Sequence, residues 1–456
     1  MPDDHILYRH PVINMQRRKV TFKLYPSAGQ AEGLLTLLRQ HKDLWNAALE
    51  ERIDAWRKRD TTGKSISYED QCRSLTQVRA ELPEDWATMN CSSQQITLRR
   101  LDKAFKAFFA RCTKGQSPGF PRFESLARMP GIGFKGHGDG WRFAPNLAKN
   151  GKPDDFGAIR WSKHGTLRLQ GLGHIKIRGE ARAAGVIKSC ELLHSRGSSG
   201  SEWHVSVTME CADVDVARRR TEHHAMGADW GVSRLMTIVR TDGAENGTHR
   251  EVREDIENPR WFKTNQERLV ALDRAVSSKR RGSKNWCKAG ARRGAFRSKV
   301  ARRRHDDQHQ TSARLAARCS IFATEALSLK NMTASAAGTV DEPGKNVRQK
   351  AGLNREILDT APAALFQKIA YKVMETGGQF LEAPTRSLKP SQRCPMCSAV
   401  VKKVLQLRWH CCGSCGHEED RDAASARVVL RWALGTLPEE QKVEKRIRGQ
   451  ELPEAA

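Results

Sequence analysis

The sequence predicts a mixed α/β protein of several domains, and three observations support this prediction. The chain has 456 residues, enough for roughly three domains of ordinary size. Apolar residues recur at helical spacing between residues 28 and 112, whereas residues 141–210 alternate in polarity as β-strands do. From residue 226 onward, short apolar strands alternate with amphipathic helices.

The N-terminal part is predicted to be one strand followed by helices. Residues 19–25 alternate in polarity and form the strand, and one or two helices follow over 28–59. Ser67 is a suitable N-cap for a second helical segment at 68–82. A further helix is expected over 92–112.

The helix at 92–112 has an apolar face and an opposite, basic face. The basic residues are Arg99, Arg100, Lys103, Lys106 and Arg111. We interpret this face as a phosphate-binding surface, because the whole chain is basic. Solvation of the charged side chains is the alternative.

Residues 141–210 are predicted to form a small β-barrel. Two strands flanking residues 197–200 have the pattern of a hairpin, because Gly and Ser separate two alternating runs. Residues 211–224 are polar and are predicted to be a linker.

The C-terminal half is predicted to be a second α/β region. Strands are expected at 226–229 and 235–240, with a hairpin turn at Asp242 and Gly243. Further elements follow in this order: a helical segment at 262–318, a buried strand at 319–329, a helix at 361–376, a short strand at 379–383 and a helix at 425–434. The charged tail, 436–456, is predicted to be disordered.

The charge of the chain predicts a polyanionic partner. There are 79 Lys and Arg residues against 52 Asp and Glu, a net charge of +27, and surpluses of this size are typical of nucleic-acid binding. Residues 279–304 contain twelve Lys and Arg and no acid, so we expect this segment to lie along phosphates. Its candidate contacts are Arg280, Arg281, Lys284, Arg292, Arg293, Arg302 and Arg303. A solvated or frayed helix face is the alternative.

The sequence also excludes a membrane protein. No apolar run approaches the roughly 20 residues of a membrane helix, and the first 20 residues lack a signal-peptide core. We therefore expect a cytoplasmic protein with reduced cysteines.

Five of the twelve cysteines fall between residues 394 and 415. Cys394 and Cys397 form one C-x-x-C pair, and Cys412 and Cys415 form another, with fourteen residues between the pairs. Four thiolates at this spacing suit one tetrahedral, structural zinc ion. A redox role would need a thioredoxin-like context, which this sequence lacks. Cys411 adjoins Cys412, but its spacing fits a zinc ligand less well.

Three acids stand beside apolar segments. Asp229 ends a strand, Glu325 follows or ends another, and Asp422 precedes the helix at 425–434. A carboxylate is costly to bury unless it binds a cation or an ion partner. If the three converge, they could hold two Mg²⁺ ions. Asp420 is the alternative third acid.

These motifs resemble those of TnpB, the transposon-encoded RNA-guided nuclease, and of the related compact type V CRISPR effectors. The resemblance lies in VTFKLYPSAGQ near the start, GADWGVSRLMTIV and TEALSLKNM in the second half, and the ordered motifs PSQRCPMC, CGSCG and DRDAASA. It implies a metal-binding catalytic triad of Asp229, Glu325 and Asp422, and a zinc ribbon held by Cys394, Cys397, Cys412 and Cys415. Ala424 stands where an Asn is common in this family.

The resemblance implies an RNase H-like (RuvC) nuclease domain with an inserted zinc ribbon, a helical recognition domain and a small β-barrel (wedge) domain. The expected segments are the wedge barrel at 1–26 and 128–215, the recognition domain at 27–127, the RuvC-like domain at 216–391 and 417–435, the ribbon at 392–416 and the tail at 436–456.

The resemblance also implies a function: an Mg²⁺-dependent DNA endonuclease that binds a guide RNA and recognises a short motif beside its double-stranded DNA target. Two catalytic Mg²⁺ ions, for which Mn²⁺ could substitute, and one structural Zn²⁺ are expected, with a monomer on one guide RNA in a prokaryotic cytoplasm. Gln94, Gln95 and Arg99 are candidates for reading the motif, because amide and guanidinium groups suit adenine and guanine edges.

Two alternatives remain open at this point. One is a guide-independent, transposase-like nuclease, and the other is an RNA-guided repressor that binds DNA without cutting it. The presence of all three acids disfavours the repressor.

Overall fold

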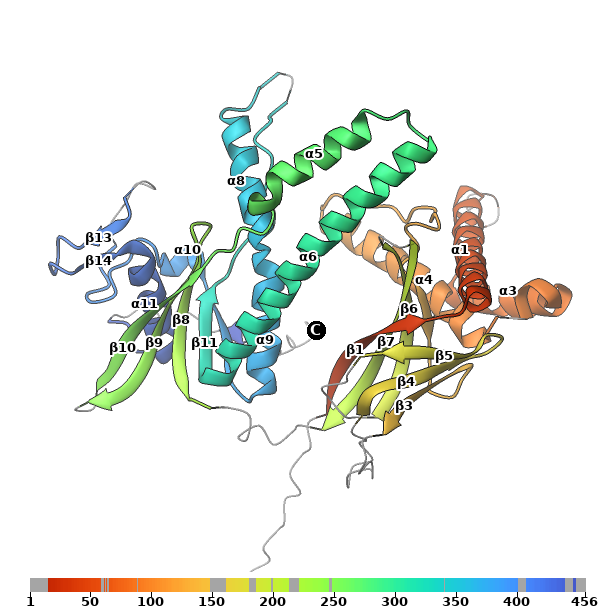
Figure 1. Ribbon diagram of the computed structural model, residues 1–456, viewed down its shortest axis with the longest axis horizontal. Coiled ribbons are helices and arrows are strands. Elements are labelled where there is room, and N and C mark those ends of the chain that lie inside the picture. Colours follow the sequence, from red (N-terminus) through yellow and green to blue (C-terminus); the bar gives the residue numbers. More distant parts are fainter. Residues whose placement is uncertain are drawn as a thin grey trace, which may run out of the picture. The chain divides into compact units, whose positions relative to one another are not determined.

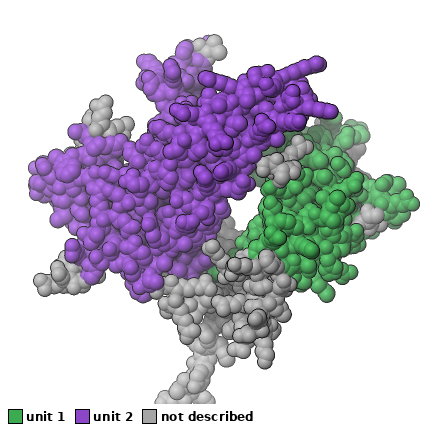
Figure 2. All heavy atoms as spheres, in the orientation of Figure 1, with its two compact units in different colours: residues 1–213 green, residues 214–456 purple. Residues whose placement is uncertain are grey.

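The computed structural model describes residues 15–58, 61, 63, 65–87, 89–147, 161–179, 186–197, 200–212, 221–245, 248–339, 341–400, 407–438 and 446–447. The chain divides into two compact units, residues 1–213 and 214–456 (Figure 2). Each unit has its own hydrophobic core. Among the described residues, no helix is both long enough and apolar enough to cross a membrane.

The helices of unit 1 form where the apolar spacing predicts them. They are α1 (Ala28–Arg57), α3 (Tyr68–Glu81), the single-turn π-helix η1 (Pro83–Ala87) and α4 (Cys91–Thr113). Ser67 caps α3 as predicted: its hydroxyl accepts from the Asp70 backbone N–H, and the Asp70 carboxylate accepts from the Ser67 N–H. The predicted segment 28–59 is one continuous helix.

The sheet of unit 1 is antiparallel. Its strands are β1 (Met15–Tyr25), β2 (Ile132–Phe134), β3 (Trp141–Leu147), β4 (Trp161–Leu169), β5 (Gly173–Arg178), β6 (Val186–Gly197) and β7 (Gly200–Ala212), and all except β2 are labelled in Figure 1. Their order is β2-β6-β7-β1-β5-β4-β3. The predicted hairpin is present, with Gly197 opposite Gly200.

We expected a small β-barrel, and this sheet is a near-barrel. Within the described part of the chain, the edge strands β2 and β3 are not hydrogen-bonded to each other. The concave side is filled by side chains from the strands, such as Phe22 and Trp203, and by Leu34 and Leu38 from α1. The helix therefore contributes to the core that the sheet encloses.

The sheet of unit 2 combines antiparallel and parallel strands. They are β8 (His224–Trp230), β9 (Arg234–Glu245), β10 (Thr248–Glu257), β11 (Cys319–Glu325), β12 (Gln379–Ala383) and β15 (Arg446–Ile447), in the order β10-β9-β8-β11-β12-β15. β8, β9 and β10 form an antiparallel meander, whereas β11 runs parallel to both β8 and β12. β15 lies inside the tail that we expected to be disordered.

The predicted hairpin turn at Asp242 and Gly243 is wrong. Strand β9 continues to Glu245, and the ladder pairs Asp242 with Arg250 and Ala244 with His249, so the register shifts at Gly243. Gly243 has φ +61°, a conformation that glycine adopts easily. Gly243 therefore lies in a β-bulge of strand β9 and not in the predicted turn.

Unit 2 also contains the helices η3 (Lys263–Asn265), α5 (Gln266–Ser277), α6 (Lys284–Arg318), α7 (Leu329–Met332), α8 (Val347–Thr360), α9 (Pro362–Glu375), α10 (Thr385–Leu388) and α11 (Arg421–Leu434). Helices α6, α9 and α11 cover the two faces of its sheet. α6 and α9 pack on one face against residues such as Phe322, and α11 packs on the other against Ala323 (Figure 1). The predicted helical segment 262–318 is broken between α5 and α6, where Gly282 has φ +84° and Ser283 caps α6.

Between α10 and α11 the chain forms two cysteine loops and a small sheet. Strands β13 (Trp409–Cys411) and β14 (Glu418–Asp420) pair antiparallel. Residues 401–406, between the two cysteine pairs, lie outside the described residues. Helix α8, which the sequence did not predict, lies between α7 and α9.

Candidate functional site

Asp229 and Glu325 lie at the carboxyl ends of two neighbouring parallel strands. Thr324 of β11 pairs with Ala228 of β8, so the acid that follows each residue lies at the same edge of the sheet. The strand alternation also puts both acids on one face. Ala225 and Ala323, an even number of residues before Asp229 and Glu325 respectively, pack on the α11 side.

Helix α11 adds a third acid to this edge. Asp422 lies in its first turn, and Ser425 follows at the i+3 position on the same side of the helix. The Ser425 hydroxyl donates to Asp229 Oδ1 at 2.9 Å and lies 3.4 Å from Glu325 Oε1. The structure thus brings together two of the predicted acids through one buried hydroxyl, with Asp422 one turn away along the same helix.

Gly227 permits the close approach of α11 to β8. A Cβ atom at this position would lie 2.3 Å from the Ala426 carbonyl oxygen and 2.4 Å from the Leu430 backbone nitrogen. Only a residue without a side chain fits against the helix backbone there. Neither Gly227 nor Ser425 is among the residues predicted from the sequence. A glycine inside an apolar strand is a signal for such an approach, and helical spacing from Asp422 points to Ser425.

The electrostatics of the site favour a bound cation. Burial raises the pKa of Asp229 well above its usual range, and the negative charges of Glu325 and Asp422 raise it further. Burial also raises the pKa of Glu325. Both carboxylates are therefore costly to ionise without positive charge, and oxygen ligands of this kind suit Mg²⁺. The three acids are less tightly clustered than the cysteines: among the described residues, only the four cysteines have potential ligand atoms all within 4.8 Å of one another.

Asp420, the alternative third acid, has a structural position. Its Oδ1 accepts from the backbone N–H groups of Asp422 and Ala423, at 3.0 and 3.2 Å, and so caps α11. Its other oxygen lies 3.4 Å from Arg234 and 3.6 Å from Arg253. Asp420 therefore begins the helix that carries Asp422, and both of its oxygens have partners in the fold.

Arginines surround the exposed side of Asp422. Its carboxylate lies 3.7 Å from the Arg421 guanidinium and 4.0 Å from those of Arg234 and Arg408. The Arg408 side chain is 64% exposed. These guanidinium groups place positive charge beside Asp422, and this charge suits an anionic ligand.

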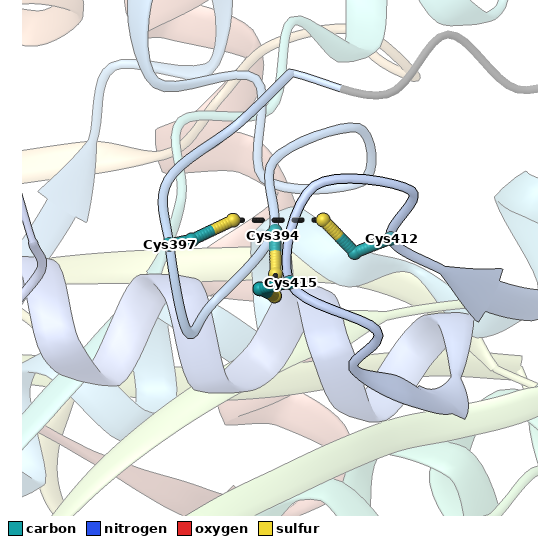
Figure 3. A group of neighbouring side chains, drawn as sticks. All are labelled: Cys394, Cys397, Cys412 and Cys415. Atoms are coloured by element: carbon teal, nitrogen blue, oxygen red, sulfur yellow. Dashed lines mark hydrogen bonds between the residues drawn. The ribbon is translucent and has the colours of Figure 1, made fainter.

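The four predicted cysteines converge from two loops (Figure 3). Cys394 Sγ lies 3.6 Å from Cys415 Sγ, and Cys397 Sγ lies 3.5 Å from Cys412 Sγ. Four sulfurs at about 2.3 Å from a tetrahedral zinc would be about 3.8 Å apart. The cluster therefore fits one structural zinc ion. Cys411 is not part of the group.

The two cysteine loops have the same backbone hydrogen bonds. In the first loop, Ser398 N donates to Cys394 O and Cys394 N donates to Ala399 O. In the second, Gly416 N donates to Cys412 O and Cys412 N donates to His417 O. Ser398 and Gly416 both have positive φ, +61° and +73°. This repeated turn directs both sulfurs of each pair to one point, as a zinc knuckle requires.

The structure separates the candidate nucleic-acid contacts of unit 1 into buried and exposed residues. Gln94 is fully buried: its amide accepts from Arg79 at 2.5 Å and donates to the Trp86 carbonyl. The prediction that Gln94 reads DNA bases is wrong, because its buried amide is not accessible to a ligand. Arg100 is likewise engaged, since it donates to the Gly131 carbonyl and to Glu191.

The remaining candidates of unit 1 are accessible. Arg99 and Lys103 are exposed, and the Arg99 guanidinium lies over the Tyr68 ring, 5.3 Å from its centroid. Gln95 is half-buried and accepts from Lys135 at 2.5 Å.

Most of the basic candidates of unit 2 are exposed. Arg280 and Arg281 lie in the loop before α6, and along the helix the exposed residues are Lys284, Arg292, Arg302 and Arg303. Arg293 differs, because it is half-buried and pairs with Asp273 of α5 at 3.4 Å. The amino-terminal half of α6 thus presents a basic surface beside α5.

Two segments of the chain match known families. Residues 204–336 match OrfB_IS605, described as "Probable transposase". Residues 363–429 match the "Cas12f1-like, TNB domain" family.

Full-length relatives carry provisional names as RNA-guided DNA endonucleases. InsQ of Escherichia coli (strain K12) is 28% identical over 415 residues, 90% of this chain and 90% of the relative. A protein of Streptomyces pristinaespiralis is also 28% identical, over 92% of this chain and 90% of its own length.

Solved structures share the fold at low sequence identity. The Cas12f1–sgRNA–target DNA complex matches with a TM-score of 0.50 and 10% identity, over 91% of this chain and 99% of that one. The mini-RNA-guided endonuclease CRISPR-Cas_phi3 matches with a TM-score of 0.51 and 8% identity, over 91% and 92%. The fold is therefore mixed α/β, multidomain and Cas12f-like.

Proposed function

Because this chain belongs to the TnpB/OrfB_IS605 family, we propose that it is an RNA-guided DNA endonuclease that cuts at the acidic edge of unit 2. One observation carries the proposal: Asp229 and Glu325 lie at the carboxyl ends of adjacent parallel strands and share the Ser425 hydroxyl of the helix that carries Asp422. Three acids gathered at the edge of one sheet are suited to metal-assisted phosphodiester hydrolysis.

The topology of unit 2 supports a RuvC-type, RNase H-like domain. An antiparallel meander continues into parallel strands, helices lie on both faces, and the zinc knuckles are inserted between β12 and α11. We propose the nuclease domain as 216–391 and 417–435, and the ribbon as 392–416. In unit 1, 27–127 would be the recognition domain, and the sheet from 1–26 and 128–215 the wedge domain.

Asp229, Glu325 and Asp422 would hold two Mg²⁺ ions, which would activate a water molecule and stabilise the leaving 3′ oxygen of the cut strand. Ser425 orients the Asp229 and Glu325 carboxylates towards each other. Arg408 and Arg421 would bind the phosphate beside the scissile bond, because both guanidinium groups lie next to Asp422. Removing either arginine should weaken DNA binding more than metal binding.

The partners follow from the charge and from the relatives. The basic surface of α6, with its preceding loop, would bind the guide RNA or the target backbone. Arg99 and Gln95 remain candidates for reading the target-adjacent motif, because their side chains are accessible in unit 1. A single chain on one guide RNA would then direct cleavage by base pairing.

The first test is to sequence the RNA that copurifies with the protein when its native flanking DNA is present. We expect a discrete RNA with a constant part and a variable segment. Absence of any specific RNA, with cleavage retained, would favour the guide-independent transposase-like nuclease.

The second test is cleavage of a matched target with Mg²⁺ or Mn²⁺. Asp229→Ala should abolish cutting while guide and target binding persist. Asp242→Ala, on the neighbouring strand β9 and paired with Arg240, is the control and should cut normally. A wild-type complex that binds its target but never cuts would make the protein an RNA-guided repressor and refute the nuclease proposal.

A further inference from the structure

Helix α11 is the one acid-bearing element of the site that is not a strand of the sheet. The backbone hydrogen bonds of the sheet position Asp229 and Glu325. The positions of Asp422 and Ser425 depend instead on the contacts that hold α11 against the sheet. Val428 and Val429 of this helix pack against apolar residues of the sheet. Apolar contacts are non-directional, so they leave sliding and rotation of the helix less well defined.

Two arginines of α11, one helical turn apart, meet the same acid of strand β10. The Arg427 Nε lies 2.7 Å from Glu251 Oε2, and the Arg431 Nε donates to Glu251 Oε1 at 2.9 Å. The three side chains are 17–20% exposed. We call Glu251, Arg427 and Arg431 the Glu251 bridge. Arg431 fixes the helix to the edge of the sheet with two directional, charge-assisted hydrogen bonds to Glu251, and Arg427 adds an ion pair to the same carboxylate.

The same two arginines also reach both zinc knuckles. Arg431 Nη1 donates to the carbonyl of Pro395, inside the first knuckle, at 2.7 Å. Arg427 Nη1 donates to Glu419 Oε2 at 2.8 Å, and Glu419 Oε1 pairs with His417 Nε2 at 2.8 Å. The His417 carbonyl in turn accepts from Cys412 N in the second knuckle. Each arginine therefore joins β10, α11 and one knuckle.

We propose that Glu251, Arg427 and Arg431 are positioning residues that transmit the geometry of the zinc knuckles to α11 and thereby place Asp422 and Ser425 beside Asp229. The zinc ion then has a role beyond the stability of its own loops. The inference rests on the proposed function in one respect, namely that the acids bind divalent cations.

Strand β10 supplies a matched pair of variants. Glu251→Gln keeps the shape of the side chain but removes the charge that both arginines share. Glu254→Gln makes the same change three residues along, on the opposite face, where Glu254 pairs with Arg318 of α6 at 3.1 Å and has 24% exposure. Both variants lose partly buried ionic contacts, those of Glu251 with two arginines of α11 and that of Glu254 with Arg318, but only the first disturbs α11.

Three measurements on the full chain test the proposal. Zinc content should stay at one ion per chain in both variants, because all four cysteines remain. Hydrogen exchange of the backbone amides in residues 421–434 should become faster in Glu251→Gln and stay unchanged in Glu254→Gln. Mn²⁺ binding, followed by electron paramagnetic resonance with Asp229→Ala as the blank, should weaken about tenfold in Glu251→Gln and remain as in wild type in Glu254→Gln.

Removal of zinc by a chelator completes the test. In the wild type, it should speed exchange in residues 421–434, and in Arg431→Met it should have a smaller effect, because one connection to the knuckles is already lost. The proposal is overturned if Glu251→Gln exchanges and binds Mn²⁺ as Glu254→Gln does, or if zinc removal leaves α11 unchanged. A wild type that binds no Mn²⁺ would refute the proposed function instead, and the exchange data would still decide whether the bridge couples zinc to α11.

Discussion

The Ser425 side chain connects Asp229 and Glu325, which lie near the ends of two separate strands. Its hydroxyl lies between Asp229 and Glu325, two acids about 100 residues apart in the chain. A buried carboxylate pair is strongly repulsive. A hydroxyl donor between the carboxylates reduces this cost and restricts their rotamers, which would organise the proposed cation site in advance.

Replacement of Ser425 by Ala should weaken divalent-cation binding. Loss of a hydrogen bond that orients a metal ligand typically costs at least about tenfold in metal affinity, and Mn²⁺ titration of the full chain would measure it. Ser312→Ala, at another buried serine in unit 2, is the control and should bind Mn²⁺ normally. Equal affinities for the two variants would show that Ser425 has no orienting role.

His41 makes the stability of unit 1 dependent on pH. The ring is fully buried between Thr97 and Ser93, at 2.8 and 3.2 Å, and burial together with the charge of Arg100 lowers its pKa to about 3. Below pH 6.5 the unfolded chain binds a proton here that the folded chain does not bind until about pH 3. Folding is therefore weakened as the pH falls through this interval.

The expected slope is about 1.4 kcal/mol of local unfolding free energy per pH unit well below pH 6.5. Hydrogen exchange of the α1 and α4 amides at pH 7.0 and 5.5, corrected for intrinsic rates, measures it. His41→Gln should remove the slope, whereas His174→Gln, at an exposed position of the same unit, should retain it. An unchanged slope in His41→Gln would assign the pH dependence to other groups.

At the scale of elements, the closest contact at the site is between α11 and β8. The helix backbone lies against Gly227, so the distance between helix and strand is set by the absence of a side chain. This contact explains why Ser425 reaches Asp229 across the interface.

Gly227→Ala should push α11 away from β8. Overpacking of this kind costs typically about 1–3 kcal/mol, and the neighbours here are backbone atoms that cannot rotate away. We expect a lower unfolding temperature for unit 2 and weaker Mn²⁺ binding. Gly294→Ala in α6, where nothing lies within 4 Å of the new Cβ, should be neutral or stabilising, by up to about 1 kcal/mol. A Gly227→Ala protein with wild-type stability and Mn²⁺ affinity would refute this account.

At the scale of the whole molecule, the net charge of +27 is the dominant property. Some of the basic residues are paired with acids of the same unit, as Arg293 and Arg297 are with Asp273. The exposed arginines of α6, such as Arg302 and Arg303, are better placed to meet phosphates.

Nucleic-acid affinity should therefore depend strongly on salt. Each phosphate contact contributes about 0.9 to the slope of log K against log salt for duplex DNA, so the double change Arg302→Gln, Arg303→Gln should reduce the slope by about 1.8. Changing Arg293 and Arg297 to Gln, which removes the same charge from residues paired with Asp273, should reduce it less. Fluorescence anisotropy over a salt series measures both, and equal reductions would contradict the assignment.

Local sequence patterns determined much of this protein. Helical spacing predicted α1, α4 and α9, and the Ser67 cap placed the start of α3, because these features depend on neighbours a few residues apart. The two C-x-x-C pairs predicted their own cluster for the same reason. The positions of Asp229 and Glu325 at strand ends also followed from pattern alone.

Only the tertiary structure decided which side chains meet. The register of β11 on β8 and the approach of α11 at Gly227 depend on residues far apart in the chain, so no local pattern predicts that Ser425 reaches Asp229. For the same reason, the sequence could not show that Gln94 is buried beneath Arg79, or that Glu251 joins α11 to the sheet. Local spacing determines the type and position of each helix or strand, whereas long-range packing determines which contacts each side chain makes.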